Sequence, residues 1–247
     1  MQKTILITGG SRGIGAATAV LAAQKGYQVC INYLQNKEAA LQVVDSINKQ
    51  GGNAFAFQAD VSQETDVLAL FKAVDQFGPL TALVNNVGIL ETQMRVIDMS
   101  AERLQRVFTS NVISCFLCTR EAIKRMSTRR GGMGGAIVNV SSIAARTGSP
   151  GEYVDYAASK GAMDAMTIGV SKEVADEGIR VNGVRPAFIY TDIHASGGEP
   201  GRVDRIKDSV PMKRGGQPEE VANAILWLLS DEASYSTGAF IDITGGR

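Results

Sequence analysis

Tyr156 and Lys160 lie four residues apart at the start of an Ala-rich stretch with a helical pattern. Side chains at positions i and i+4 share one face of a helix. A positive charge beside a phenol favours the phenolate, so we expect Lys160 to lower the pKa of Tyr156 from its usual value of about 10. A tyrosine adjusted in this way can exchange a proton with an alcohol or a carbonyl. The alternative is an ordinary exposed Tyr–Lys pair, so the rest of the chain has to decide.

A glycine-rich turn near the start of the chain has the pattern of a phosphate-binding loop. It follows an apolar, β-branched run at 4–8 and precedes a helical pattern at 16–25. Glycines let backbone N–H groups approach a pyrophosphate, and the helix N-terminus adds partial positive charge. The position between a first strand and a first helix therefore predicts dinucleotide binding rather than a plain tight turn. The turn consists of Gly9, Gly10, Ser11, Arg12, Gly13, Ile14 and Gly15.

The end of the second predicted strand, 28–32, indicates which dinucleotide is bound. An Asp or Glu at this point often holds the ribose 2′-hydroxyl of NAD. This chain has Asn32 and Tyr33 there, and it has Arg12 within the glycine turn. The missing carboxylate removes repulsion against a 2′-phosphate, and a guanidinium adds a charged partner for it. The sequence therefore favours NADP over NAD, although Arg12 could also be a solvated loop residue.

Helical and strand patterns alternate along the remaining chain. Such alternation predicts an α/β fold, a single-domain Rossmann-type doubly wound structure over 1–247 with a mainly seven-stranded parallel sheet and helices on both faces. Polar residues that follow the strands, including Asp60, Asn85 and Ser142, should then meet at one edge of the sheet, where ligands bind. The irregular segment 192–210 is predicted to be a substrate loop. Helices are expected at 37–50, 63–77, 101–129, 154–177 and 218–229, and strands at 54–59, 81–84, 136–140, 179–184 and 240–243.

Composition argues against several other classes of protein. Lys and Arg together number 25, as do Asp and Glu, so nothing favours a nucleic-acid or membrane partner. Neither an 18-residue apolar run nor a signal peptide is evident, and a cytoplasmic location is expected. Three cysteines in apolar stretches are read as core thiols, and no metal site is expected. The single histidine, His194, is read as an incidental loop residue.

Taken together, these spaced motifs resemble the short-chain dehydrogenase/reductase family from the first strand to the last. The run 149–156 is similar to a subgroup of sugar dehydrogenases and uncharacterised oxidoreductases. Two positions depart from the family pattern, with Val87 in place of Ala and Ala187 in place of Gly. Each adds carbon atoms beside the expected cofactor path, and altered affinity is expected before lost activity. The motifs are Thr8-Gly9-x3-Gly13-x-Gly15, Asp60-Val61, Asn85-Asn86-Val87-Gly88, Asn111, Ser142, Tyr156-x3-Lys160, and Pro186 followed by Thr191.

The resemblance implies a role for each matching residue. Tyr156 would be the general acid or base, Lys160 would lower its pKa and bind the nicotinamide ribose, and Ser142 would bind the substrate oxygen. Asn111 would hold a water in a proton relay. The cofactor-binding positions implied by the motifs are Gly9, Ser11, Arg12, Gly13, Ile14, Gly15, Asn32, Tyr33, Asp60, Val61, Asn86, Gly88, Tyr156, Lys160, Pro186, Ile189 and Thr191.

The predicted activity is hydride transfer between the nicotinamide of NADP and a carbonyl or alcohol carbon, with Tyr156 moving the proton. A catalytically silent dinucleotide sensor or partner-binding protein is the alternative. Within the enzyme reading, a sugar, a carrier-bound ketoacyl group and other carbonyl compounds stay open as substrates. The family commonly forms homotetramers, and the apolar stretches at Phe116-Leu117 and Met163-Met166 are compatible with that.

Overall fold

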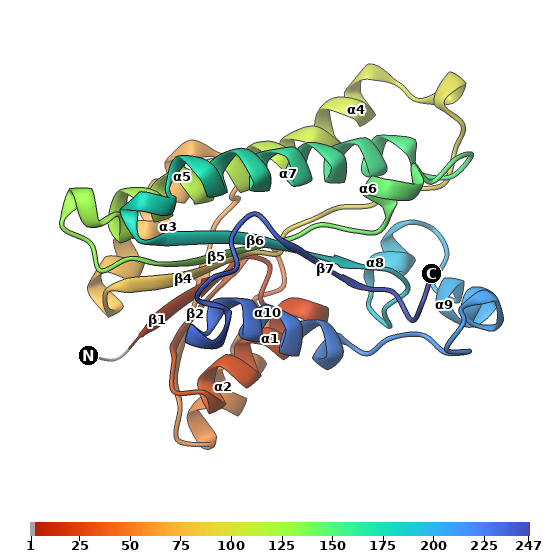
Figure 1. Ribbon diagram of the computed structural model, residues 1–247. Coiled ribbons are helices and arrows are strands. Elements are labelled where there is room, and N and C mark those ends of the chain that lie inside the picture. Colours follow the sequence, from red (N-terminus) through yellow and green to blue (C-terminus); the bar gives the residue numbers. More distant parts are fainter. Residues whose placement is uncertain (1–2) are drawn as a thin grey trace.

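A computed structural model describes residues 3–247, which form a seven-stranded, all-parallel sheet with the strand order β3-β2-β1-β4-β5-β6-β7 (Figure 1). The central strands are apolar and buried on both faces, as parallel sheets covered by helices require. The predicted α/β fold class is therefore confirmed. The strands are β1 (Thr4–Ile7), β2 (Gln28–Tyr33), β3 (Asn53–Gln58), β4 (Leu80–Asn85), β5 (Gly135–Val140), β6 (Ile179–Pro186) and β7 (Phe240–Ile243).

Helices cover both faces of the sheet. On one face lie α1 (Gly13–Gln24), α2 (Lys37–Lys49) and α10 (Pro218–Leu229), which pack in one apolar core with the strands. On the other face lie α3 (Glu64–Phe77), α4 (Ala101–Phe108), α5 (Ser114–Met126) and α7 (Val154–Glu173) (Figure 1). All strands point the same way, so their carboxyl ends share one edge of the sheet with the C-terminus of the chain.

The chain departs from the predicted elements in three places. The single helix expected over 101–129 ends at Met126, and a five-residue π turn (Thr109–Ile113) interrupts it between α4 and α5. Segment 192–210, predicted to be an irregular loop, contains α8 (Ile193–Ser196), α9 (Arg202–Ile206) and a 3₁₀ turn (Lys207–Ser209). Its helices are too short for a hydrophobic period to show in the sequence. The helix expected over 154–177 ends at Glu173, and a 3₁₀ turn (Ala175–Glu177) follows it. Other short elements include α6 (Ala144–Thr147) and a 3₁₀ turn at Val96–Asp98.

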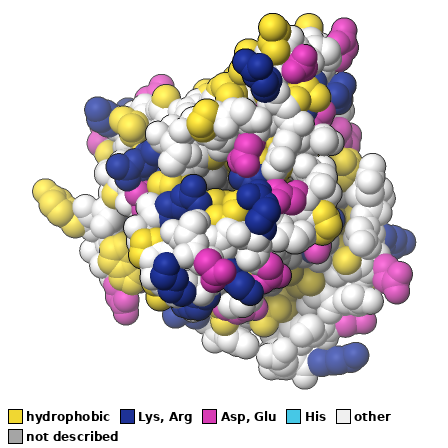
Figure 2. Space-filling view, turned by 90° about the vertical axis from the view of Figure 1, so that its right-hand side faces the viewer, with side chains coloured by type: hydrophobic (Ala, Val, Ile, Leu, Met, Phe, Trp, Pro, Cys, Tyr) yellow, Lys and Arg dark blue, Asp and Glu magenta, His cyan; other side chains and the backbone are white. Residues whose placement is uncertain are grey.

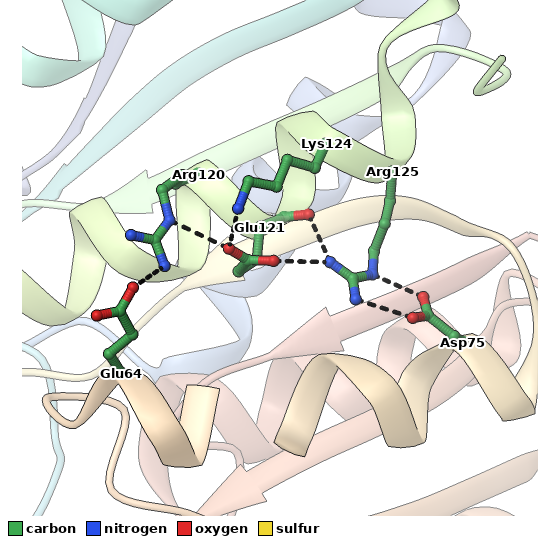
Figure 3. Close-up of polar contacts among 6 residues, drawn as sticks. All are labelled: Glu64, Asp75, Arg120, Glu121, Lys124 and Arg125. Carbon is green, nitrogen blue, oxygen red and sulfur yellow. Dashed lines mark hydrogen bonds and ion pairs between the residues drawn. The ribbon is translucent and has the colours of Figure 1, made fainter. Parts of the chain in front are cut away.

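Helices α3 and α5 are joined by a cluster of ion pairs around Glu121 (Figure 3). The Glu121 side chain is only 4% exposed, yet its carboxylate oxygens accept hydrogen bonds from Arg120, Lys124 and Arg125. Arg125 continues to Asp75 of α3, and Arg120 continues to Glu64. These cations lower the pKa of Glu121 against the opposing effect of its burial. The buried carboxylate is therefore kept charged, and it links the two helices above the sheet.

The three cysteines, Cys30, Cys115 and Cys118, are buried free thiols, as predicted. Met163 and Met166 are also buried within the chain and pack with Cys115. Within residues 3–247, no helix is both long enough and apolar enough to cross a membrane.

Candidate active site

A cavity of about 980 Å³ opens at the carboxyl edge of the sheet and contains most of the predicted site residues. Ser142, Tyr156 and Lys160 line it together with the glycine turn and segment 192–210. Two predicted residues, Gly15 and Asn111, do not line it. Figure 2 shows this face of the molecule, where basic and acidic side chains alternate around apolar ones. The structure thus brings together residues that are far apart in the sequence.

The glycine turn leaves no space for side chains where the backbone must approach a ligand. Gly9 and Gly13 have φ values of +62° and +53°, in the left-handed region that favours glycine. A Cβ atom added to Gly15 would lie 2.4 Å from the carbonyl oxygen of Gly9, so Gly15 permits the close packing of the turn. The turn leads directly into α1. This cradle fits a pyrophosphate at a helix N-terminus.

The side-chain amide of Asn32 forms hydrogen bonds within the fold. Its side-chain nitrogen donates to the carbonyl oxygen of Ala59 at 2.9 Å, and its side-chain oxygen accepts from the backbone N–H of Gly9 at 3.3 Å. The amide therefore ties β2 to the segment after β3 and to the glycine turn. Arg12 is exposed at the cavity and is the basic side chain of the turn. Leu34, Gln35 and Asn36 also line this end, which the sequence motifs did not single out.

Asn86 and Asp60 shape the same half of the cavity through contacts with backbone. The side-chain nitrogen of Asn86 donates to the carbonyl oxygens of Thr8 and Gly9, at 3.0 Å each. One carboxylate oxygen of Asp60 accepts from the backbone N–H and the hydroxyl of Ser62, at 2.9 and 2.7 Å. The Asn86 bonds fix the segment after β4 against the glycine turn, and the Asp60 bonds shape the turn that follows β3.

Tyr156 and Lys160 share one face of α7, as their spacing predicted, but the expected decrease in the pKa of Tyr156 does not occur. Burial raises the pKa of Tyr156 to about 12, and an interaction with Ser142 only partly opposes this. Burial also lowers the pKa of Lys160 to about 8. The Lys160 ammonium donates to the carbonyl oxygen of Val140 at 2.7 Å and lies 5.6 Å from the centre of the Tyr156 ring. Desolvation is therefore the largest influence on the pKa of each side chain.

Asn111 lies in the π turn, fully buried beneath the cavity. Its side-chain oxygen accepts from the backbone N–H of Ile89 at 2.7 Å. Its nitrogen donates to the Ile89 carbonyl at 3.1 Å and to the Ser159 hydroxyl at 3.0 Å. Every atom of the amide that can form hydrogen bonds is thus engaged with the segment after β4 and with α7. Asn111 connects three elements that surround Tyr156 and Lys160.

The segment after β6 completes the wall opposite the glycine turn. The Ser142 hydroxyl accepts from the backbone N–H of Ala144 at 3.1 Å and lies 3.4 Å from the carbonyl oxygen of Pro186. Ala187 is unstrained, since the non-glycine residues with positive φ among those described are Ser149 and Lys213. His194, expected in a loop, is buried in α8, where Nε2 lies 3.0 Å from the Ile189 carbonyl oxygen. Burial lowers its pKa.

Two ion pairs around the cavity, one buried and one partly exposed, were not identified from the sequence. Arg103 of α4 binds Asp155, the neighbour of Tyr156, at 2.7 Å, and both side chains are at most 4% exposed. Arg202 of α9 binds Glu152 at 2.6 Å, just before α7. The partners are about fifty residues apart, so no spacing rule connects them. One feature of the sequence could have indicated these pairs: charged residues, Glu152 and Asp155, lie next to Tyr156.

Comparison with known proteins gives the family. A family profile described as "Enoyl-(Acyl carrier protein) reductase" matches residues 9–247. The chain is 65% identical over 243 residues to the uncharacterized oxidoreductase YgfF of Escherichia coli, covering 98% of each chain. It is 37% identical over 247 residues to the 3-oxoacyl-[acyl-carrier-protein] reductase FabG of Staphylococcus aureus, covering 100% of this chain and 98% of that protein.

A solved structure agrees. The 3-ketoacyl-(acyl-carrier-protein) reductase from Brucella melitensis, complexed with NADH, superimposes with a TM-score of 0.91 at 32% identity, covering 99% of this chain and 98% of the other. The fold, the cavity and these matches define a nicotinamide dinucleotide-binding oxidoreductase. The chain belongs to the short-chain dehydrogenase/reductase family.

Proposed function

We propose that this chain is an NADP-dependent oxidoreductase that transfers a hydride between the nicotinamide and a carbonyl or alcohol carbon. The observation that carries the proposal is the convergence of Ser142, Tyr156 and Lys160 on one cavity with the glycine turn. A phenol, a hydroxyl and an ammonium side by side can hold a substrate oxygen and exchange a proton with it. The nicotinamide, when bound, supplies or accepts the hydride.

Tyr156 acts as the general acid when a carbonyl is reduced. Its raised pKa of about 12 keeps the hydroxyl protonated at neutral pH, so a proton is available for the substrate oxygen. Ser142 donates a hydrogen bond to the same oxygen and stabilises the charge that develops on it. Lys160 stabilises the phenolate that remains and holds the nicotinamide ribose. Asn111 positions the segments around this pair, and a water held there would return the proton from solvent.

The preference for NADP rests on Arg12. It is an exposed guanidinium at the adenosine end of the cavity, and no acidic residue follows β2. Asn32 favours NADP because it carries no negative charge that would repel the 2′-phosphate. Its amide is itself hydrogen-bonded to Gly9 and Ala59. The Brucella melitensis relative was crystallised with NADH, so a direct comparison of both cofactors is required. The adenosine-facing positions are Asp60, Val61, Asn86 and Gly88, and the nicotinamide-facing positions are Pro186, Ile189 and Thr191.

We further propose that residues 1–247 act as one domain in which segment 192–210 is the substrate loop, and that the chain assembles into a homotetramer. Exposed apolar side chains on the outer face of α4 and α5 support the assembly, because large apolar surfaces are costly in water. They include Phe108, Ile113 and Phe116. Cross-linking and light scattering would distinguish a tetramer from smaller assemblies.

The proposal is tested by following NADPH oxidation across a panel of carbonyl compounds with the wild type and Tyr156→Phe. We expect turnover by the wild type and a loss of about a thousandfold or more in the variant, with NADPH affinity retained. Tyr153→Phe is the control for loss of a neighbouring phenolic hydroxyl, because within residues 3–247 the Tyr153 hydroxyl donates only to the Gly197 carbonyl oxygen, at 3.3 Å. NADPH binding without turnover on any carbonyl would instead support a catalytically silent sensor.

A further inference from the structure

The substrate side of the cavity contains a charged pair within reach of a ligand. Arg202 Nη2 lies 2.6 Å from Glu152 Oε2, and both residues line the cavity that contains Tyr156. The Arg202 side chain is 8% exposed and that of Glu152 is 34% exposed. Glu152 stands four residues before Tyr156, and Arg202 is the first residue of α9. The pair therefore joins segment 192–210 to the start of the catalytic helix.

Both members of the pair are held in place by their surroundings. The Arg202 guanidinium lies 4.8 Å from the centre of the Tyr153 ring and 5.7 Å from that of Phe188. The backbone of Glu152 is fixed by a 3.1 Å hydrogen bond from the N–H of Met94 to its carbonyl oxygen. Stacking and backbone bonds of this kind reduce the entropy lost when a ligand binds.

The ion-pair network that contains this pair carries no net charge, and Arg247, on the Phe188 ring, lies outside that network. Glu199 lies 3.5 Å from Arg202 and 3.0 Å from Arg205, so two carboxylates are balanced by two guanidiniums. The alternation of acidic and basic side chains on this face is visible in Figure 2. A strongly anionic or cationic group on the substrate would meet a group of like charge here. A neutral group that can both donate and accept hydrogen bonds would not.

Hydrogen-bonding capacity remains on both partners. Glu152 Oε1 has no hydrogen-bond partner within residues 3–247, and only two of the five N–H groups of Arg202 can be assigned to carboxylates. A free acceptor beside free donors matches a hydroxyl group, which donates one hydrogen bond and accepts others. An alkyl chain in the same place would displace water from these atoms. Their hydrogen bonds to water would then not be replaced, and this loss costs binding free energy.

We propose that Glu152 and Arg202 bind a hydroxyl group of the substrate at a distance from the reacting carbon, so that the preferred substrates are small, uncharged polyhydroxy carbonyl compounds or the corresponding polyols. The hydroxyl donates to Glu152 Oε1 and accepts from the Arg202 guanidinium. The inference rests on the proposed function and names its substrate class. It disfavours long apolar acyl chains at this site.

The test compares matched pairs of aldehydes with NADPH as the reductant: glyceraldehyde with propanal, and erythrose with butanal. We expect the wild type to favour the hydroxylated member by at least about a hundredfold in kcat/KM, because a site built for a hydroxyl rejects the analogue that lacks it. In Glu152→Leu/Arg202→Leu the preference should fall by at least about tenfold, through a higher KM for the hydroxylated aldehydes. Glu152→Gln keeps the shape and an acceptor oxygen, and should lose less.

The control carries the same substitutions at an exposed ion pair that does not line the cavity, Arg129→Leu/Asp176→Leu. It should leave the substrate preference unchanged, and NADPH affinity and circular dichroism establish that each variant is folded. Equal kcat/KM values for butanal and erythrose in the wild type, or an unchanged preference in the double variant, would overturn the inference while leaving the oxidoreductase function intact.

The absence of any NADPH-linked reduction would overturn the proposed function instead. Calorimetric titration with erythritol then decides the inference by itself. Binding that weakens by about tenfold or more in the double variant supports it, and no binding to the wild type refutes it.

Discussion

The Nζ atom of Lys160 lies 5.6 Å from the centre of the Tyr156 ring and donates a 2.7 Å hydrogen bond to the carbonyl oxygen of Val140. Lys160 is buried and Tyr156 is half-buried at the cavity wall. Desolvation favours the neutral form of each, so it lowers the pKa of Lys160 to about 8 and raises that of Tyr156 to about 12. At neutral pH the site therefore combines a protonated phenol with a charged ammonium. This combination is suited to donating a proton to a carbonyl oxygen.

The first prediction concerns the pH dependence of reduction. As pH rises, Lys160 is the first of the two groups to lose its proton, since its pKa of about 8 lies below that of Tyr156. We expect kcat/KM for carbonyl reduction to be constant below pH 7 and to fall about tenfold per pH unit above 8. In Lys160→Arg the break near pH 8 should disappear, whatever the absolute rate. A break that persists at the same pH would assign it to another group.

The second prediction concerns stability. The pKa of Lys160 falls from 10.5 to about 8 on folding, so the unfolded chain binds more protons between these values. The free energy of unfolding should therefore rise with pH from 8 to 10.5, by on the order of 3 kcal/mol from this group. Urea denaturation of Tyr156→Phe and Tyr156→Phe/Lys160→Met isolates the effect, because the raised pKa of Tyr156 acts in the opposite sense above pH 10. Parallel pH profiles for the two variants would contradict it.

The third prediction concerns Arg12 and the choice of cofactor. Removing the guanidinium in Arg12→Leu should raise the KM for NADPH by about tenfold or more, since a charge-assisted hydrogen bond to phosphate is lost. The KM for NADH should change little. Lys25→Leu, at the opposite end of α1, provides the control for general loss of positive charge. An equal effect of Arg12→Leu on both cofactors would place Arg12 at the pyrophosphate instead.

The fourth prediction separates cofactor choice from folding at Asn32. Asn32→Asp introduces the acid that often accompanies NAD, but its carboxylate would replace an amide that donates to the Ala59 carbonyl oxygen at 2.9 Å. We expect a loss of about 2–4 kcal/mol in the free energy of unfolding rather than a clean change to NAD. Asn36→Asp, at the exposed start of α2, should be nearly neutral, because Asp and Asn are comparable N-caps. Urea denaturation measures both variants.

The fifth prediction concerns the buried pair Arg103–Asp155. Arg103→Met leaves an unpaired buried carboxylate next to Tyr156 and should cost about 3–5 kcal/mol of unfolding free energy. Arg103→Met/Asp155→Leu should recover much of that loss, because neither charge is then left unpaired. Breaking the exposed pair Arg106–Glu91 with Arg106→Met should cost less than about 1 kcal/mol. A double variant that is less stable than Arg103→Met would show that the pair itself is strongly stabilising.

The sequence predicted the order of strands and helices because the strands are short apolar runs and the helices have marked starts and ends. Pro218 and the two acids after it, for example, placed α10 correctly. The contacts of Asn32 were not predicted because its partners, Gly9 and Ala59, lie in the segments that follow two other strands, β1 and β3. The direction of the pKa change at Tyr156 was not predicted from the sequence, for a related reason. Spacing shows that Lys160 is near, but the degree of burial decides which effect is larger.

The irregular parts were the least predictable. Segment 192–210 contains two short helices whose positions depend on tertiary contacts such as the ion pair between Arg202 and Glu152. The π turn at Thr109–Ile113 has no residue signature that distinguishes it from continuous helix, and it shows only in the backbone hydrogen bonds.

That π turn restricts how this chain can change in evolution. A helix turns by about 100° per residue, so deleting one residue from Thr109–Ile113 to restore a regular helix would rotate all of α5 relative to α4. The rotation would move Asn111 away from Ile89 and turn Glu121 away from its position between α3 and α5. A π turn contains one residue more than a regular α-helical turn. Point substitutions cannot remove that residue, and deleting it would disrupt the contacts of Asn111 and of Glu121 together. Natural variants of this helix should therefore accumulate substitutions while its length between Ser100 and Met126 stays constant.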